Sequence, residues 1–558
     1  MISPTAVSLA FAFALSIRLT SSLALSIWIV LALALFSRIA LAVYSRRAKR
    51  LAMRNVRGPA SDTFIEGNLT QLNDVNGLDF LNNLLAEYGP VSKLHGLCGD
   101  TVLVASDPRT LSHLLLKDPD NFPEIDFTGT TIILEYMFGP GLISANGSRH
   151  RHQRKMLNPL FSTAHMRRIS PLVNSITKQY RDRFATQVPH GKACIDVAPG
   201  LACLGLEIIG QAGFGHTFNA LDGGAEEYIR AAKEILPSTT ALAPYILLLV
   251  ATGLSSLPAG LLRVVGSALT YLSPPLKSLM AGVDYLFLTA QGIWRAKKAA
   301  YATGDALLQE SVVQGGDLLS VLLKENALAN RADKLSDEEL LAQLNTFIIA
   351  GAESTSTVIC RVLYQLALHP ETQDRLRAEV SQAGEDLEYD TLMNLPLLDA
   401  VCRETMRQHT FFPFRSRLVT KATTIPRTDG ETIYVPAGTE IIMNLHGLNT
   451  DPAIWGADAQ KWRPERWLNP LPESVGAAKV PSIYGHSMTF LGGPKSCIGY
   501  TLAVLEIKNA LAVLLPQFRF DLPEQQEIVW RFGITISPSV KGDKTFNPTM
   551  PLLVSRLD

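Results

Sequence analysis

The residues best suited to chemistry lie near the C-terminus, where the sequence FLGGPKSCIG occupies positions 490–499. This stretch offers one cysteine, Cys497, on a glycine-rich loop that runs into an apolar helix expected over residues 498–508. A thiolate is a good iron ligand, but it must stay ionised and lie close to a flat macrocycle. The loop therefore predicts an iron site with a thiolate ligand.

Other features of the loop favour the same chemistry. Gly493 and Gly499 permit close backbone approach and unusual φ values. Amides at the start of the following helix can donate to the sulfur and stabilise its charge. Phe490 can pack under the macrocycle and shield the sulfur from water.

Two other interpretations of the loop are weaker. If Cys497 were an inert, buried thiol, the spacing Phe-x-x-Gly-x-x-x-Cys-x-Gly would have arisen by chance. The probability of that is about one in a thousand for this composition. A phosphate-binding loop needs Gly-x-x-x-x-Gly-Lys-Ser/Thr, which is absent, and Pro494 removes an amide that such a loop would use.

The loop resembles the haem-binding loop of the cytochrome P-450 superfamily, in which the cysteine is the proximal iron ligand. The resemblance implies haem b as the cofactor, with Cys497 as the axial metal ligand. The family usually has Arg or His two positions before the cysteine, whereas this chain has Lys495. A lysine keeps a cationic contact to a haem propionate but loses the bidentate fork of arginine.

A second motif joins two distant segments. Glu404 and Arg407 are spaced i and i+3, so on a helix they share a face and can pair; taken alone, such a pair is most often a solvated surface pair. Residues 462–467 read WRPERW, and the family completes its Glu-x-x-Arg pair with the arginine of such a Pro-Glu-Arg segment. The resemblance implies that Glu404, Arg407 and Arg466 form a buried structural ion network behind the haem, and removal of one partner would be strongly destabilising.

A long apolar helix is predicted upstream, from a capping box at Ser336 to about Leu368, where His369-Pro370 ends it. At 1.5 Å per residue it is roughly 45 Å long. Its middle reads AGAEST, residues 350–355. Small residues, an acid and two hydroxyls are costly inside a helix, and close helix packing with exposed polar residues is one explanation.

The family offers the other explanation, because there this segment crosses the distal side of the haem. Its small residues make room for dioxygen and substrate, and its acid and hydroxyl organise proton delivery. The resemblance therefore implies catalytic roles for Glu353, Ser354 and Thr355. The family usually has threonine where this chain has Ser354, which keeps the hydroxyl but loses the methyl group and its rotamer restriction, so either Ser354 or Thr355 can carry the hydroxyl role.

A fourth motif is the basic run GSRHRHQRK, residues 147–155, which on its own would suggest a surface for nucleic acid or anionic lipid. The chain has 51 basic and 51 acidic residues and a formal net charge of zero, so we expect no nucleic-acid partner. The run resembles the family's helix beside the haem propionates. That resemblance implies propionate contacts from His150 and Arg154, and Arg417 is expected as a further haem-binding residue.

The length of 558 residues would ordinarily suggest several domains, but the motifs follow one another in a single order from 147 to 499. We expect one haem-thiolate catalytic domain over residues 61–558, mainly α with a smaller β-rich lobe. A hairpin is predicted over 91–97 and 101–106, and a further β-rich stretch over 423–444. The six cysteines show no disulfide or zinc spacing, which fits a reducing compartment.

Residues 1–45 are predicted to form a membrane anchor. The stretch 19–36 is long enough to span a bilayer with its flanks, and a second short span over 6–17 is the alternative. A basic linker over 46–60 follows, so the catalytic domain is expected to face the cytosol at the endoplasmic reticulum membrane. The apolar stretch 241–293 is broken by prolines, and we expect a membrane-dipping lid there rather than a second transmembrane segment.

The resemblance implies that one atom of dioxygen enters the substrate while the other leaves as water, with electrons from NADPH. No Gly-x-Gly-x-x-Gly segment follows a strand, so electrons are expected from NADPH–cytochrome P-450 reductase, with cytochrome b5 as a further partner. The segments WGAD at 455–458 and WRPERW resemble those of fungal members of the family. An apolar substrate that partitions into the bilayer is expected, such as a terpenoid, sterol or other secondary metabolite.

Substrate contacts are expected, by analogy with the family, from the loop 126–143, the segment that begins at Ile349, the turn 534–540, and an apolar wall of Phe411, Phe412 and Phe414. An ordinary core role is the alternative for the three phenylalanines.

Two rival functions stay open at this point. A haem-thiolate isomerase or dehydratase would act on peroxides without external electrons, and such relatives often lose the distal acid–hydroxyl pair or lengthen the cysteine loop. A non-enzymatic membrane haem or lipid-binding protein would lack the ligand or the distal site. Dependence on NADPH and a reductase discriminates between these functions.

Overall fold

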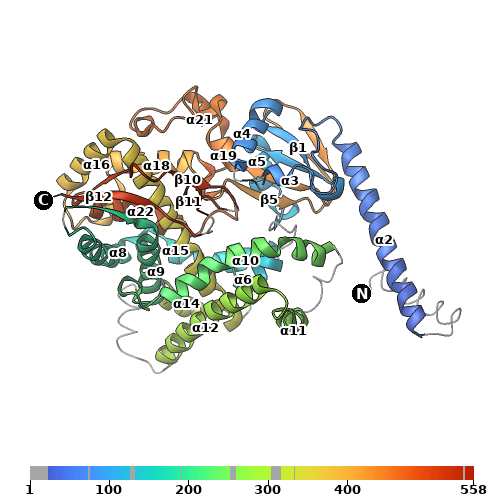
Figure 1. Cartoon of the computed structure of the whole chain (residues 1–558), viewed down its shortest axis with the longest axis horizontal. Coiled ribbons are helices and arrows are strands. Elements are labelled where there is room, and N and C mark those ends of the chain that lie inside the picture. The colour runs from blue at the N-terminus through green and yellow to red at the C-terminus, as the bar shows by residue number, and fades with distance from the viewer. Residues whose placement is uncertain are drawn as a thin grey trace.

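Helices make up most of the molecule, and a smaller β-rich part lies beside them, as the computed structural model shows (Figure 1). The expected mainly α architecture with a smaller β-rich lobe is confirmed. The structure describes residues 23–72, 74, 76–125, 132–189, 191–251, 259–302, 316–331, 333–533, 535–543 and 547–557. The expected short span over 6–17 lies outside these residues, as does the start of the stretch 19–36.

The α-helices are of very different lengths. Those that carry or border the candidate site are α7 (Gly147–Leu157), α8 (Thr163–Thr186), α9 (Val197–Ile208), α15 (Asp337–Leu368), α18 (Pro396–Gln408) and α22 (Tyr500–Leu514). The others are α2 (Leu23–Ala52), α3 (Leu69–Leu72), α4 (Gly77–Tyr88), α5 (Pro108–Ser112), α6 (Ile132–Phe138), α10 (Glu226–Ala251), α11 (Ala259–Leu269), α12 (Pro274–Ala302), α14 (Leu318–Leu328), α16 (Pro370–Ala383), α17 (Tyr389–Met393), α19 (Leu445–Asn449), α20 (Pro452–Trp455) and α21 (Glu473–Ala478).

The main sheet has five strands in the order β1-β2-β8-β5-β3. The hairpin is confirmed, because β1 and β2 pair antiparallel with Val91 opposite Ala105. The stretch 423–444 contains three strands, as expected. The strands of the main sheet are β1 (Val91–His95), β2 (Thr101–Ala105), β3 (Glu124–Ile125), β5 (Phe414–Leu418) and β8 (Glu440–Asn444); the smaller sheets are β6 (Thr423–Pro426) with β7 (Thr432–Val435), β4 (Lys192–Asp196) with β12 (Pro551–Arg556) and β9 (Phe518–Asp521), and β10 (Ile528–Arg531) with β11 (Ser537–Val540).

Helix α15 begins and ends where the sequence predicts. Ser336 accepts a hydrogen bond from the amide of Glu339, whose side chain in turn accepts from the amide of Ser336, and this closes the capping box. Among the helices that the structure describes, α15 has the length and hydropathy of a membrane span, but 67% of its most apolar stretch is buried inside the protein. It is therefore a core helix.

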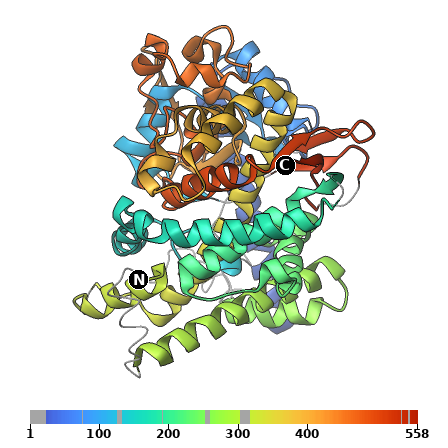
Figure 2. The same cartoon turned by 90° about the vertical axis from the view of Figure 1, so that its left-hand side faces the viewer.

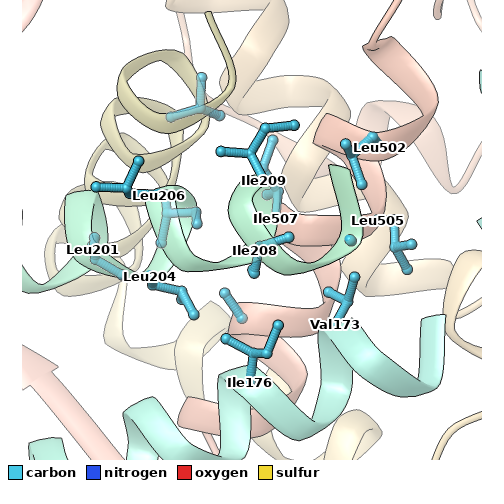
Figure 3. Packing of buried hydrophobic residues seen from close by; sticks show 14 of the residues in the cluster. Val173, Ile176, Leu201, Leu204, Leu206, Ile208, Ile209, Leu502, Leu505 and Ile507 are labelled. Atoms are coloured by element: carbon cyan, nitrogen blue, oxygen red, sulfur yellow. The ribbon is translucent and has the colours of Figure 1, made fainter. Parts of the chain in front are cut away.

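The largest core cluster surrounds α15 and joins it to α8, α9 and α22. Side chains of α8, α9 and α22 point towards one another in it, among them Ile176, Leu204 and Leu505 (Figure 3). Helix α22 begins at Tyr500, two residues later than expected, because Gly499 caps it and residues 490–499 stay in the loop. Packing on several sides therefore fixes α15 and α22, the two helices that approach the cysteine loop.

Helices α10, α11 and α12 form a layer on one side of the molecule (Figure 2). α10 and α12 lie in contact, and a Cβ on Gly282 would be only 3.1 Å from the carbonyl oxygen of Ala231. Large apolar side chains on this layer are exposed, with Tyr271 92% and Leu272 82% accessible.

Helix α2 extends from the β-rich part at the edge of the molecule (Figure 1). It continues to Ala52, into the stretch 46–60 that the sequence analysis describes as a basic linker. The physical reason lies at its C-terminal end, where Lys49 is buried and pairs with Asp100 at 3.0 Å. After Met53, Gly58 lies so close to β1 that a Cβ would be 2.0 Å from the Lys93 carbonyl oxygen.

Candidate functional site

The loop that carries Cys497 is held by its own backbone. The amide of Cys497 donates to the carbonyl of Phe490 at 2.9 Å, and that of Ser496 donates to Gly493 at 3.0 Å. Gly493 has φ +73°, and a Cβ there would lie 2.3 Å from the carbonyl oxygen of Leu115. Glycine is therefore required at position 493.

Gly499 does not show the unusual φ that we expected. Its φ is −87°, and a Cβ there would make ordinary contact with the Phe161 ring at 3.8 Å. Close approach occurs instead at Gly492, where a Cβ would be 1.5 Å from the carbonyl oxygen of Pro481. Two neighbouring glycines thus fix the path of the loop, and Gly492 was not singled out from the sequence.

The thiol of Cys497 combines accessible surface with a desolvated environment. Its side chain is exposed, yet burial raises its pKa, while a hydrogen bond from the amide of Gly499 and the charge of Arg154 lower it. A side chain with both properties faces a space that protein surrounds. Phe490 packs beside this loop against Tyr484 and Tyr500, with ring centroids 5.5 and 6.0 Å away.

Two cations lie near Cys497: Arg154, which contacts the loop from α7, and Lys495, which belongs to the loop. Arg154 of α7 donates from Nη1 to the Ser496 carbonyl at 2.5 Å and from Nε to Asn158 at 2.8 Å. Lys495 donates to the carbonyl of Ala145, and burial lowers its pKa to about 8, so the ammonium stays charged at neutral pH.

Arg417 of β5 is 1% exposed, and its Nη2 atom has no partner among the described residues. Its Nη1 atom lies 3.4 Å from Oε1 of Glu124. A buried guanidinium with an unused donor is costly unless an acceptor satisfies it. A bound anion at this place would supply the missing acceptor.

His150 is 4% exposed on α7, and its pKa is about 3, lowered by burial and then by Lys495 and Arg154. It is therefore neutral at physiological pH and can donate one hydrogen bond. Two other bases of this helix are surface residues with acidic partners: Arg149 lies 3.3 Å from Glu339 and Arg151 2.6 Å from Asp120.

The middle of α15 separates the two candidate hydroxyls. Ser354 is half-buried and donates to the Ala350 carbonyl one turn earlier at 2.6 Å. Ala350 and Glu353 are exposed although they lie within a core helix, whereas Thr355 is 3% exposed. The structure thus places Ser354 on an accessible face and Thr355 inside the protein.

Thr355 is hydrogen-bonded to Glu506 of α22, which sequence reasoning missed. Glu506 is 2% exposed, and burial raises its pKa to about 8 despite this hydrogen bond. Its Oε2 atom has no partner among the described residues. The only sequence signal was an acid within the apolar run 500–514.

The three residues of the expected ion network meet in the interior. Glu404 lies 2.8 Å from Arg407 and 3.4 Å from Arg466, and all three are at most 3% exposed. The amide of Arg463 and the indole of Trp467 also donate to Glu404, at 3.0 and 2.9 Å. The two segments that the sequence pairs therefore do come together.

The three phenylalanines divide into two groups. Phe411 and Phe412 are half-buried and meet edge to face at 4.8 Å, and the carbonyl of Phe411 accepts from the amide of Ile536. Phe414 is also half-buried, and it packs against Phe532 at the edge of a separate core cluster under the main sheet. Phe414 therefore has different packing partners from Phe411 and Phe412.

A largely apolar cavity of about 60 Å³ lies between α9, α10 and α15. Ile349 and Glu353 line it, together with Tyr228 and Pro538. None of its lining residues belongs to the Cys497 loop. Residues 126–131 and Ile534, which were also expected to contact substrate, lie outside the described residues.

Comparison with known proteins identifies relatives along nearly the whole chain. The family model described as Cytochrome P450 matches residues 58–534. Cytochrome P450 monooxygenase 91 of Postia placenta is 38% identical over 519 residues, which cover 90% of this chain and 94% of that protein. A ganoderic acid synthetase of Ganoderma lucidum is 35% identical over 91% of this chain and 95% of its own length.

Proposed function

The chain belongs to the cytochrome P450 family of monooxygenases, and we propose that it inserts one oxygen atom of dioxygen into an apolar substrate that partitions into membranes. The substrate is of terpenoid or sterol type or a similar secondary metabolite. The Ganoderma lucidum relative, named for ganoderic acid, supports this class. The family implies haem, and we propose that the form is haem b.

The residues around Cys497 fit such a group. The exposed thiol faces an enclosed space, and the close approach at Gly493 holds the loop backbone in place. Arg417 offers a buried, unused donor for a propionate. Cys497 would hold the iron, and Arg417, Lys495, Arg154 and His150 would hold the propionates.

One observation carries the proposal: Thr355 of α15 is hydrogen-bonded to Glu506 of α22. Glu506 lies nine residues after Cys497, so this contact brings the Glu353–Thr355 segment beside α22, the helix that follows the cysteine loop. A thiolate ligand and an acid–hydroxyl pair on an accessible helix face are then parts of one site. This is the constellation that oxygen insertion needs and that peroxide isomerases often lack.

The protein's own residues would move protons and exclude water, whereas bound haem iron supplies the activation of dioxygen. Ser354 holds a proton at Oγ, which now donates to the Ala350 carbonyl. Glu353, exposed one residue earlier, can pass protons to it from solvent. Ser354 is the better candidate for this role, because Thr355 is already committed to Glu506.

Electrons would come from a separate NADPH–cytochrome P-450 reductase, with cytochrome b5 as a second donor, on the face near Lys495. Helix α2, 30 residues long and therefore about 45 Å, would anchor the chain in the endoplasmic reticulum membrane. Phe36, Leu41 and Tyr44 are exposed on it. The exposed apolar side chains of α11 and the turn after it would then touch the bilayer as a lid.

Substrate would reach the site along Phe411, Phe412 and Ile349. The cavity beside Ile349 has a volume of about 60 Å³, whereas small-molecule sites usually have roughly 300–1,000 Å³. A terpenoid or sterol that used this cavity would therefore require the α10 layer to move. A substrate that comes from the bilayer fits such a movement, because the exposed apolar side chains of this layer are the ones that would touch lipid.

The test is product analysis after co-expression with a reductase and candidate terpenoid or sterol scaffolds. The proposal expects an oxygenated product that appears only with NADPH, dioxygen and reductase. Turnover of a peroxide without an electron donor would favour the isomerase instead. A haem-loaded protein that turns over no lipid would favour a carrier.

A further inference from the structure

A buried charge cluster lies between β3, β5 and the cysteine loop. Its acid is Glu124, 6% exposed, and its bases are Arg415, Arg417 and Lys495. Glu124 and Arg417 are directly opposite each other in the β3–β5 pair. Oε1 of Glu124 contacts Arg415 and lies 3.4 Å from Arg417, and Oε2 lies 3.9 Å from Nζ of Lys495.

All four side chains are charged at neutral pH. Burial alone would raise the pKa of Glu124, but Arg415, Arg417 and Lys495 outweigh it and hold this pKa well below its ordinary value. One negative and three positive charges leave the cluster with a surplus of two positive charges. Such a surplus inside a protein is costly unless other anions balance it.

One hydrogen-bond donor in this positively charged cluster is unused. Nη2 of Arg417 is buried and has no partner among the described residues, while its Nη1 atom is occupied by Glu124 and by the Ser416 carbonyl at 3.0 Å. Arg154 is held by Ser496 and Asn158 beside Cys497, and its charge also reaches Lys495, whose pKa it lowers. Its charge offsets that of a Cys497 thiolate, so it is left out of the charge balance of the cluster although its side chain can still reach a propionate.

We propose that Glu124 is a positioning residue that sets the charge of this cluster so that two cationic charges remain for the two carboxylates of the haem. Glu124 also fixes Arg415 and Arg417 in place before the group binds. Without it, three cations would face two propionates, and the protein without haem would contain three uncompensated charges, of which Arg417 is buried and Arg415 and Lys495 are half-buried. The inference rests on the proposed haem site and goes beyond the residues assigned to it.

The test uses the full-length protein loaded with haem. Glu124→Gln raises the surplus to three and Arg415→Gln lowers it to one, while the double variant restores two. Transfer of haem to an excess of a haem-scavenging globin gives the rate of haem loss, and spectroelectrochemistry gives the midpoint potential of the iron. Asp120→Asn removes the same charge from an exposed pair with Arg151 and is the matched control.

We expect haem loss to slow by roughly tenfold in Glu124→Gln and to quicken by roughly tenfold in Arg415→Gln, since charge-assisted contacts to the propionates gain or lose strength. The midpoint potential should move positive in the first variant and negative in the second. The double variant and Asp120→Asn should behave like the wild type. Without haem, Glu124→Gln should unfold at lower denaturant than the wild type.

A purely structural role for Glu124 gives a different pattern. Both single variants would then lose haem faster, and the double variant would be worse than either. That result, in a wild type that does carry haem, overturns this inference alone. A wild type that takes up no haem overturns the proposed function and this inference with it.

Discussion

Arg407 donates to Glu404 through two atoms, Nε and Nη2, both at 2.8 Å, and neither side chain has accessible surface. The remaining Nη1 of Arg407 donates to the carbonyls of Asn449 and Ala459. Both charges are therefore desolvated but satisfied by hydrogen bonds. The hydrogen bonds from Nη1 join α18 to Asn449 and Ala459, which precede the cysteine loop in the chain.

Replacement of Glu404 by glutamine is expected to lower the free energy of unfolding by about 3–5 kcal/mol, because buried Arg407 loses its counter-ion and buried Arg466 keeps only Asp458. Urea unfolding followed by circular dichroism measures this loss. Glu465→Gln is the matched control, since Glu465 pairs with Arg375 at 2.7 Å in an exposed position, and such pairs contribute at most about 1 kcal/mol. Equal losses in the two variants would contradict the buried network.

Gly493→Ala is expected to disrupt the cysteine loop. A left-handed backbone costs a non-glycine residue about 1–2 kcal/mol, and the added Cβ would also lie 2.3 Å from the Leu115 carbonyl oxygen. The measurement is the haem content of purified protein. Gly476→Ala places a Cβ in open space within α21 and should leave haem content unchanged. Normal haem content in Gly493→Ala would show that the loop path is not fixed as described.

Glu506 is expected to make stability depend on pH. Its pKa is about 8 in the folded protein against an ordinary 4.5, so the folded protein keeps a proton that the unfolded chain releases. The stabilisation is complete below about pH 4.5, is lost as pH rises to about 8 by up to about 1.4 kcal/mol per pH unit, and is then constant.

The free energy of unfolding, measured from pH 5 to pH 9, tests this dependence. Glu506→Gln cannot ionise, so the difference in stability between wild type and variant should change steadily from pH 5 to about pH 8 and then level off, with lower wild-type stability at high pH. A constant difference would mean that Glu506 does not titrate as described.

Ser354→Ala is expected to uncouple NADPH oxidation from product formation, because the variant lacks the hydroxyl on the accessible face of α15. Peroxide released per NADPH consumed should rise several-fold, and Ser354→Thr should restore coupling. Ser356→Ala is the matched control, since Ser356 donates to the Glu353 carbonyl at 2.9 Å within the helix and is buried. Equal uncoupling in both serine variants would place the proton path elsewhere.

Local patterns predicted much of this fold. The capping box at Ser336 and the break at His369-Pro370 gave both ends of α15, because helix termini depend on a few adjacent residues. The Glu404 network was found because resemblance to a known family supplied its long-range partner, Arg466. Periodicity alone could not have joined residues 62 positions apart.

Features that depend on packing were missed. Glu124 and Glu506 carry no sequence signature, and their roles arise only when β5 and α15 bring partners to them. Phe414 was grouped with Phe411 and Phe412, yet on strand β5 it packs against a separate cluster under the sheet, with Phe532 as its ring neighbour. The backbone at Gly499 was also mispredicted, since helix α22 starts only at Tyr500.

The most direct test of the whole account is the visible spectrum of the purified protein, reduced and exposed to carbon monoxide. Thiolate ligation by Cys497 predicts the long-wavelength Soret band that this ligand gives, and its loss in Cys497→Ala. A protein that stays colourless after adequate haem supply, or that shows a spectrum of imidazole ligation, would contradict the account.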